Sequence, residues 1–346
     1  MYKKLNIILL WSIIGFSCSV DPEIKPQLPV ENIRQVVPEG WPSPVYTYQN
    51  NPLTEDGFAL GRSLFYEKML SRDNTISCGS CHQNFVAFAH SEHKFSHGID
   101  GLLGNRNAPG LFNLNWNTSF MWDGGINHIE VQPLGPISNP VEMDSDLNAV
   151  ISKLSSSNKY KQLFLRAFGT DSINSQRILF ALAQFQGMLY SYNSKYDYYK
   201  RVEVGGEMNA QELSGYNLFV QKCNSCHKEP LFTDYEFRNN GLSMNPILQD
   251  TGRAHITGSP SDRYKFKTPS LRNIALTAPY MHDGRFNTLD EALNHYTSGI
   301  VNYGTLDPIL QNGITLSSQE KADIKAFLLT LTDYKLLSDE RFRDPN

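Results

Sequence analysis

Cys78-Gly79-Ser80-Cys81-His82 is the stretch that decides the fold, and it has a counterpart at Cys223-Asn224-Ser225-Cys226-His227. Two thiols three positions apart lie on one turn of backbone, so both can add to the vinyl groups of one haem. The adjoining histidine can then reach the iron. The sequence therefore predicts two covalently attached c-type haems. Their thioether bonds would form on Cys78, Cys81, Cys223 and Cys226, and their proximal iron ligands would be His82 and His227.

Other uses of paired cysteines fit this chain less well. A zinc ribbon places its second C-x-x-C about 15–20 residues after the first, whereas these two pairs lie in different halves of the chain. A thioredoxin-like dithiol does not require a histidine directly after both motifs. With 5 Cys and 9 His in 346 residues, residue frequencies give roughly 0.002 accidental C-x-x-C-H matches per chain. Two chance matches are therefore excluded.

Length and charge limit the remaining classes. A chain of 346 residues is long enough for two domains, each with its own hydrophobic core. One haem motif falls in each half, so we expect one domain over residues 51–200 and another over 201–346. A net charge of −4 and a pI near 6.1 give no basic footprint, so nucleic acid is not expected as a partner.

The N-terminus has the features of an export signal. Lys3 and Lys4 precede an apolar run, and Gly15-Phe16-Ser17-Cys18 closes the segment, so residues 1–18 are predicted to be a signal peptide. A small residue before Cys18 is typical of bacterial lipoprotein processing, which would leave a lipid anchor on that cysteine. The alternative is an ordinary signal peptide that is cut nearby. Either way we expect an exported, periplasmic protein whose residues 19–50 form an extended tether or arm.

Periodicity predicts a mainly α fold. A helix is expected from about Thr54 to Lys68, and Gly61 on its inner face would allow another helix to approach closely. The pattern G-x-x-L-F precedes both haem motifs, at Gly61 and at Gly215. Each half should also end in an amphipathic helix, whose inner faces are Ile178, Leu182, Phe185, Leu189 and Ile324, Phe327, Leu328, Leu331. This order of elements predicts two cytochrome c-like domains, one for each haem.

A plain electron carrier needs little besides two ligated haems, but further motifs stand between and after them. The motifs are R-N-A-P at 106–109, F-M-W-D-G at 120–124, G-P-I-S-N-P-V-E-M at 135–143 and F-K-T-P-S-L-R-N at 266–273. In their order and their amino-acid residues, these motifs resemble those of the bacterial dihaem cytochrome c peroxidases and their MauG relatives. The resemblance extends over about residues 50–335. It implies a peroxidatic haem in the first domain and an electron-transfer haem in the second.

The resemblance also implies roles for single residues. Glu142 corresponds to the catalytic acid and Gln132 to its neighbour over the iron, while Trp122 corresponds to the tryptophan between the haems. One carboxylate over an open iron site can move a proton between the two oxygens of hydrogen peroxide. The resemblance further implies an inter-domain calcium ion, for which the ligands would be Asn107, Thr277 and the carbonyl of Pro279.

The distal iron ligands distinguish the branches of this family. For the first haem, His97 best matches the histidine that peroxidases release when the second haem is reduced. For the second haem, peroxidases have a methionine fourteen residues beyond the histidine of H-D-G, and this chain has Tyr296 there. MauG-type enzymes carry tyrosine at that place. Tyr296 could instead be a packed aromatic, with the iron five-coordinate or held by His295 or Met281.

Three functions follow from these features. The leading prediction is an enzyme that reduces hydrogen peroxide to water with electrons from a small cytochrome c or copper protein. The alternative, which Tyr296 motivates, is a MauG-like enzyme that uses peroxide to modify a partner protein oxidatively. The third is a non-catalytic dihaem electron carrier with two permanently six-coordinate irons. Family members often pair, so a homodimer is also an expectation.

Overall fold

The computed structural model describes residues 33–345, so the predicted signal segment and Cys18 lie outside the described residues. The described chain is mainly α, as predicted, with short helices joined by long irregular segments. The helices are α1 (Glu55–Phe65), α2 (Cys78–Cys81), α3 (Leu134–Ser138), α4 (Leu147–Ser155), α5 (Asn158–Phe168), α6 (Ser175–Gly187), α7 (Lys195–Lys200), α8 (Ala210–Lys222), α9 (Ala254–Thr257), α10 (Leu289–Asn294), α11 (Ser318–Leu329) and α12 (Tyr334–Ser338). Two-residue strands β1 (Phe237–Arg238) and β2 (Phe266–Lys267) form an antiparallel pair.

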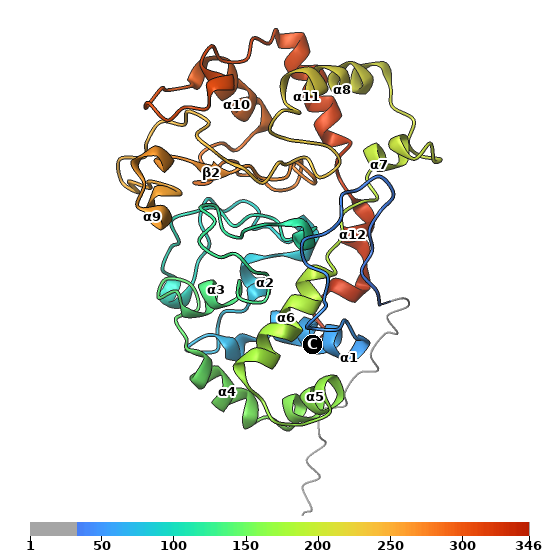
Figure 1. The fold of residues 1–346 in the computed structure, drawn as a ribbon, viewed down its shortest axis with the longest axis vertical. Helices are drawn as coiled ribbons and strands as arrows, with labels where there is room; N and C mark the ends of the chain where they lie inside the picture. Colours follow the sequence, from blue (N-terminus) through green and yellow to red (C-terminus); the bar gives the residue numbers. More distant parts are fainter. Residues whose placement is uncertain (1–32, 346) are drawn as a thin grey trace, which may run out of the picture.

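The molecule has two lobes stacked along its long axis (Figure 1). The lobe built from the first half of the chain contains α1 to α6, and the other contains α8 to α11. Each lobe has its own cluster of buried hydrophobic side chains, which we call the first core and the second core. The first core is centred on residues such as Phe58, Leu64, Phe88, Phe164 and Phe185, and the second on Tyr196, Phe219, Phe232, Ile324 and Phe327.

The predicted first helix exists and begins where its cap is expected. Thr54 precedes α1, and its side chain accepts a hydrogen bond from the Gly57 backbone N–H at 3.0 Å. The close approach predicted at Gly61 is confirmed, because a Cβ placed there would lie 1.9 Å from the Ala181 carbonyl oxygen of α6. Only glycine allows α1 and α6 to cross at this separation.

The second lobe repeats this crossing with α8 and α11. A Cβ on Gly215 would lie 1.9 Å from the Asp323 carbonyl oxygen, which matches the distance at the first crossing. Both helices begin with a capping box, formed by Asn209 with Glu212 and by Ser317 with Glu320. The inner faces predicted for the two closing helices are buried at all eight positions. The sequence echo therefore corresponds to a repeated helix pair.

The chain passes between the lobes twice. Tyr196 of α7 already belongs to the second core, a few residues before the boundary expected near residue 200. After α11 the chain returns, and Leu336 of α12 and Phe342 pack in the first core. The Phe342 ring lies 6.1 Å from that of Phe58, and Tyr66 donates a hydrogen bond to the Phe342 carbonyl at 2.6 Å. The C-terminal segment thus ties the lobes together.

The described part of the predicted arm, residues 33–50, contains no helix or strand and packs on the first lobe. Trp116 donates its indole N–H to the Pro42 carbonyl at 2.7 Å, and its ring meets that of Trp41 edge-on at 5.0 Å. Trp41 also lies 4.7 Å from the guanidinium of Arg272, which belongs to the second half of the chain. The arm therefore contacts both halves.

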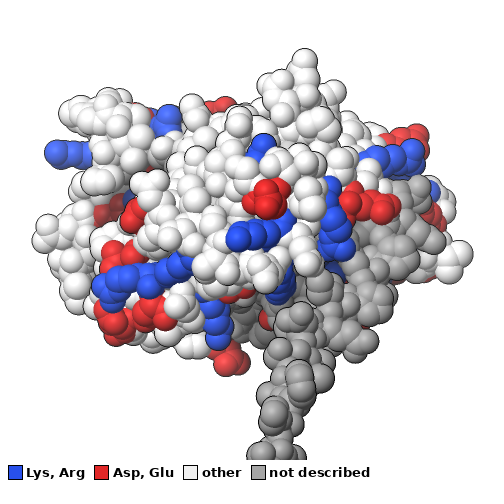
Figure 2. Space-filling model, turned by 90° about the horizontal axis from the view of Figure 1, so that it is seen from below, with Lys and Arg blue, Asp and Glu red and all other residues white. Residues whose placement is uncertain are grey.

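Lys and Arg side chains lie close to Asp and Glu side chains on the face shown in Figure 2, without a large patch of one sign. This mixture agrees with the nearly balanced composition, 31 basic against 35 acidic residues. Within residues 33–345, no helix is long and apolar enough to cross a membrane.

Candidate active site

One cavity of about 910 Å³ lies along the boundary between the lobes. Its volume is at the upper end of the range for small-molecule and cofactor sites. Both C-x-x-C-H motifs line this cavity, and so do most of the residues that the sequence singled out. The predicted site residues on its wall are Cys78, Cys81, His82, Asn107, Trp122, Gln132, Glu142, Cys223, Cys226, His227, Thr277, Pro279 and Tyr296.

The two haem motifs have the same local backbone. The N–H of His82 donates to the Cys78 carbonyl at 2.9 Å, and the N–H of His227 donates to the Cys223 carbonyl at 3.0 Å. Each motif is therefore one helical turn, which brings both cysteines and the histidine to the cavity as the spacing predicts. None of the four cysteines forms a disulfide within the described part of the chain.

Both motif histidines use Nδ1 for hydrogen bonds to backbone carbonyls. For His82 the partner is Phe88, at 2.7 Å. For His227 the partners are Phe232 at 3.2 Å and Pro269 at 3.1 Å. This arrangement leaves Nε2 available for iron and fixes the orientation of each ring. Burial lowers the pKa of both histidines, which favours the neutral imidazole that binds metal.

The structure reveals a longer internal repeat than the G-x-x-L-F echo. The motif Phe120-Met121-Trp122-Asp123-Gly124 corresponds to Tyr280-Met281-His282-Asp283-Gly284, at a fixed offset. Met121 and Met281 both have positive φ, of 66° and 73°. The flanking bridges Phe120–Ile126 and Tyr280–Phe286 are equivalent as well. The repeat is visible in the sequence but was not among the predictions. It makes His282 the counterpart of Trp122.

Glu142 lies in the wall of the cavity with a single side-chain hydrogen bond. Asn139 donates its amide N–H to Glu142 Oε1 at 2.8 Å. Burial raises the pKa of Glu142 above its ordinary value, and the Asn139 hydrogen bond partly opposes this by stabilising the ionised form. A partly desolvated carboxylate with a raised pKa is suited to taking up and releasing a proton.

Gly98 sets the position of Glu142, a role that no sequence pattern had indicated. The Ile99 N–H donates to the Glu142 carbonyl at 2.7 Å. A Cβ on Gly98 would lie 2.1 Å from the Val141 carbonyl oxygen and 2.6 Å from Glu142 Cα. No larger residue fits without moving the segment that carries Glu142. The sequence shows a glycine directly after His97, but it does not show that this glycine packs against the backbone of Val141 and Glu142.

Gln132 also lines the cavity. Its Oε1 is buried and has no hydrogen-bond partner within the described residues. A buried amide oxygen without a partner is unfavourable, so a ligand that donates a hydrogen bond would satisfy it. Hydrogen peroxide is such a donor.

Gln186 of α6 likewise has a buried Oε1 without a partner among residues 33–345 and lines the same cavity. No sequence pattern had indicated this residue.

Trp122 is held where the two halves of the chain meet. Its indole N–H donates to the Asn107 carbonyl at 2.8 Å. Its own carbonyl accepts a hydrogen bond from the Lys267 N–H at 2.7 Å, and the Asn107 N–H donates to the His282 carbonyl at 2.8 Å. Residues of both halves therefore fix the ring in the cavity wall.

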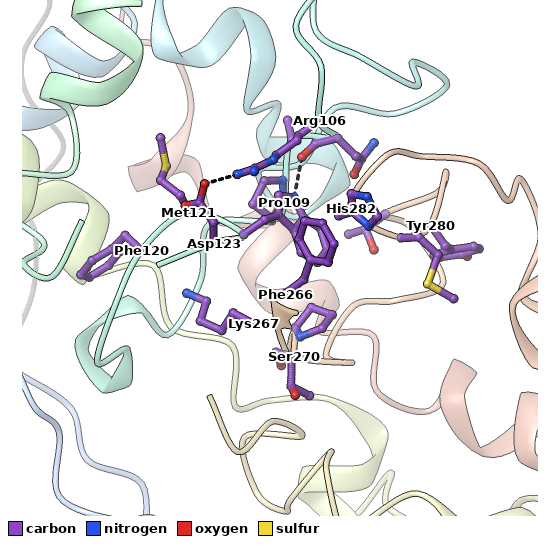
Figure 3. Close-up of a pocket in the computed structure, with 18 of the residues that line it drawn as sticks. Arg106, Pro109, Phe120, Met121, Asp123, Phe266, Lys267, Ser270, Tyr280 and His282 are labelled. Atoms are coloured by element: carbon purple, nitrogen blue, oxygen red, sulfur yellow. Dashed lines mark hydrogen bonds and ion pairs between the residues drawn. The ribbon is translucent and has the colours of Figure 1, made fainter. Parts of the chain in front are cut away.

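Arg106 joins the halves through ion pairs, as Figure 3 shows in part. Its guanidinium contacts Asp123 at 2.5 Å and Asp250 of the second half at 2.7 Å. It also lies 5.7 Å from the ring centroid of Phe266, and Phe266 stacks on His282 with centroids 3.7 Å apart. These contacts give the cavity wall between the two haem motifs a defined shape.

Only some of the candidate distal ligands of the second haem reach the cavity. Tyr296 and Met281 line the cavity and converge on Asn240, whose Nδ2 lies 3.5 Å from the Tyr296 hydroxyl and 3.6 Å from Met281 Sδ. His295 does not line the cavity, and its Nε2 is paired with the Asn240 carbonyl at 2.9 Å. Burial raises the pKa of Tyr296. Tyr296 and Met281 thus remain as side chains that could face this iron.

His97 is not brought to the cavity. Its side chain is exposed, and its ring lies 5.2 Å from that of His93. Its neighbours Ser96 and Gly98 do line the cavity. In this conformation the wall near Cys81 therefore carries Glu142 and no histidine from this loop.

The three predicted calcium ligands reach the same cavity from both halves of the chain. Asn107 comes from the first half, and Thr277 and Pro279 come from the second. The Asn107 amide N–H groups face the carbonyls of His93 and Lys94 at 3.4 Å. Its side-chain oxygen is therefore the atom that it could offer to a cation.

These residues fit two c-type haems. The cavity presents two pairs of free thiols, two oriented imidazoles and a largely apolar wall. Its unpartnered amide oxygens, on Gln132 and Gln186 of the described chain, are groups that a ligand in the cavity could satisfy.

Comparisons with known proteins agree with this arrangement. Residues 55–205 match the family model described as di-haem cytochrome c peroxidase. The methylamine utilization protein MauG of Methylorubrum extorquens is 35% identical over 85% of this chain and 82% of its own length. The cytochrome c551 peroxidase of Nitrosomonas europaea is 34% identical over 96% of this chain and 94% of its own. A crystal structure of a MauG-like protein associated with microbial copper homeostasis superposes with a TM-score of 0.82, at 34% identity over 89% of this chain and 98% of that one.

Proposed function

Because the chain belongs to the dihaem cytochrome c peroxidase family and is a peroxidase-type oxidoreductase, we propose that it reduces hydrogen peroxide to water. The reaction consumes two electrons and two protons for each peroxide and yields two waters. We assign peroxide binding to the part of the cavity wall that carries Gln132 and Glu142, on the side of the first haem opposite its proximal ligand His82. The observation that carries this assignment is the half-buried Glu142 carboxylate, which lines the same cavity as the first haem motif.

Two haems, held by Cys78 with Cys81 and by Cys223 with Cys226, would supply iron that binds peroxide and changes oxidation state. The chain supplies the proton chemistry. Ionised Glu142 would take the proton from the inner oxygen of peroxide and return it to the departing oxygen, which leaves as water. The Gln132 amide would hold peroxide in place, because its unpartnered Oε1 can accept a hydrogen bond from the peroxide O–H.

Trp122 is our candidate for passing electrons between the two halves. Its indole N–H donates a hydrogen bond to the Asn107 carbonyl, and its backbone carbonyl accepts one from the N–H of Lys267 in the second half. The electrons would come from a small soluble cytochrome c or copper protein and enter through the second lobe. The relative named cytochrome c551 peroxidase supports a cytochrome donor.

Tyr296 favours a second candidate function. MauG-type enzymes resemble this chain at that position, and Tyr296 lines the cavity together with Met281, near enough to Cys223 and Cys226 to interact with them electrostatically. The chain would then use peroxide to oxidise residues of a partner protein. Under this function reduced cytochrome c would be a poor substrate, and a protein partner would gain covalent oxidation products in a peroxide-dependent manner.

His97 remains our proposal for a removable distal ligand of the first haem. Its ring is exposed and does not line the cavity in this structure. Ligation would require the segment around His97 to move while Gly98 stays packed against Glu142. Electron paramagnetic resonance of the fully oxidised and half-reduced protein distinguishes the two states, because loss of a histidine ligand changes the ferric spin state.

We also propose an inter-domain calcium ion bound by Asn107, Thr277 and the Pro279 carbonyl. These are oxygen donors of mixed side-chain and backbone type from both halves of the chain, which suits calcium.

Export to the periplasm, with a lipid on Cys18, and pairing into a homodimer are proposals that rest on the sequence and the family resemblance.

The decisive experiment compares the protein with its Glu142→Gln variant. We expect the protein to oxidise reduced cytochrome c in the presence of peroxide, and E142Q to lose about 10²–10⁴-fold in kcat/KM for peroxide. Haem content and optical spectra of the variant should be unchanged. Equal activity of E142Q would refute the role of this carboxylate, and absence of turnover even after pre-reduction would refute the peroxidase function.

A further inference from the structure

A lysine on the wall of the cavity has no anionic partner within residues 33–345. Five lysine and arginine side chains line the cavity in this part of the chain, namely Arg106, Lys222, Arg238, Lys267 and Arg272. Four of them have a carboxylate within 4 Å, at Asp123 and Asp250, Glu320, Asp234 and Asp307, and Asp197 respectively. Lys267 has none among the described residues, and its ammonium donates to the Ser119 carbonyl.

The environment of this ammonium is poor in solvating groups. Its nitrogen lies 5.8 Å from the ring centroid of Phe120. Figure 3 shows the side chain extending toward Phe120 and Asp123, away from Phe266 on the same strand. Burial lowers the pKa of Lys267 to about 8, an effect that Asp123 only partly opposes. Lys267 is half-buried, and a largely desolvated cation with no carboxylate within 4 Å would be stabilised by an added anion.

Lys267 also stands where the two lobes meet. Its backbone, on β2, donates to the Trp122 carbonyl, and its side chain reaches Ser119 of the first half. Two residues further on, the Pro269 carbonyl contacts the ring of His227. The ammonium is therefore carried by the backbone that supports the second haem motif and points toward the first half.

We propose that Lys267 binds a propionate carboxylate of a haem at the boundary between the lobes and thereby raises the reduction potential of that haem. Each haem in this cavity would bring two propionates, which are the anions that the described chain does not itself provide at this place. A cation beside the macrocycle favours the ferrous form, which has one positive charge fewer than the ferric form. The inference rests on haem attachment and does not depend on peroxide turnover.

Three variants test this role by redox titration of the purified dihaem protein, followed in its optical spectrum. Lys267→Met removes the charge and the hydrogen bond, while Lys267→Gln removes the charge but keeps a donor for the Ser119 carbonyl. Lys265→Met is the matched control, because Lys265 is paired with Asp262 at 3.3 Å and does not line the cavity. The haem content of each variant is measured by the pyridine haemochrome spectrum.

We expect K267M and K267Q to lower the midpoint potential of at least one haem, and K265M to leave both potentials unchanged. If K267M fails to fold with haem, K267Q alone decides the outcome. Unchanged potentials in a fully loaded K267Q protein would overturn the proposal and leave Lys267 a structural residue. Because the readout is a potential, failure here is distinguishable from failure of the peroxidase function, which would appear as absent turnover with altered or unaltered potentials.

Discussion

At the scale of single residues, the site depends on how its polar groups are held. Glu142 has one side-chain partner, Asn139, and its backbone is fixed by Ile99 and by the close contact with Gly98. Few interactions hold the carboxylate, so each should have a measurable effect on the proton transfer we assign to it.

The pH dependence of activity should report the pKa of Glu142. The carboxylate must be ionised to take a proton, so kcat/KM for peroxide should fall as the pH drops through its pKa, which burial raises above the ordinary value of a glutamate. Asn139→Ala removes a hydrogen bond that favours the ionised form. We therefore expect the acid limb of the pH profile to move to higher pH in this variant.

The control for this measurement is Asn148→Ala, an exposed asparagine on α4, which should leave the profile in place. A limb in N139A at the same pH as in the unchanged protein, or at lower pH, would mean that another group controls the profile.

Gly98→Ala should reduce activity without removing haem. The added methyl group cannot fit beside the Val141 carbonyl and Glu142 Cα, so the segment carrying the carboxylate must shift. A displacement of about 1 Å near a reacting group can cost about 10²-fold in rate. Gly104→Ala is the matched control, since a Cβ there would have no neighbour closer than 3.8 Å. Peroxide-dependent oxidation of cytochrome c measures both, and full activity of G98A would contradict the contact.

At the scale of elements, the architecture repeats one device. In each lobe, the helix before the haem motif crosses the closing helix at a glycine, where a Cβ would lie the same 1.9 Å from a carbonyl oxygen of the other helix. The crossing packs α1 against α6 and α8 against α11. The helix that precedes each haem motif, α1 or α8, is therefore held in a defined position.

Alanine at either crossing glycine should destabilise the protein. Gly61→Ala and Gly215→Ala force the helices apart, and overpacking of this kind costs about 1–3 kcal/mol or more. We expect both variants to unfold at lower urea concentration, by similar amounts because the two crossings are alike. Gln221→Ala, on an exposed position of α8, should change little. An unchanged unfolding midpoint in both glycine variants would show that the helices separate at negligible cost.

At the scale of the whole molecule, the lobes are joined by more than the connecting chain. The C-terminal segment crosses back, so Leu336 and Phe342 complete the first core. Arg106 pairs with carboxylates of both halves, and the cavity extends along the boundary between them. The geometry between the two haem motifs is therefore set by the folding of both halves together.

Removing the Phe342 side chain should destabilise the first lobe although the residue lies near the C-terminus. The ring is 5% exposed and packs between Phe58 and Phe185, so Phe342→Ala should cost about 3–5 kcal/mol of unfolding free energy. Tyr334→Ala is the control, because Tyr334 is 72% exposed. Chemical denaturation followed by the optical spectrum of the haems measures the loss. Equal stability of the two variants would contradict the packing of the C-terminal segment.

The sequence by itself determined the haem motifs, the helical class and the repeated G-x-x-L-F pattern, because each depends on residues a few positions apart. It also placed Glu142, Gln132 and Trp122 among the candidate residues, through motifs that resemble those of a known family. Only the tertiary structure decided which distant residues share the cavity. It brought Tyr296 and Met281 to the wall and left His295 and His97 away from it, and it left Lys267 without a counterion among the described residues. Such outcomes depend on contacts between segments far apart in the chain, whose separation and orientation no local pattern encodes.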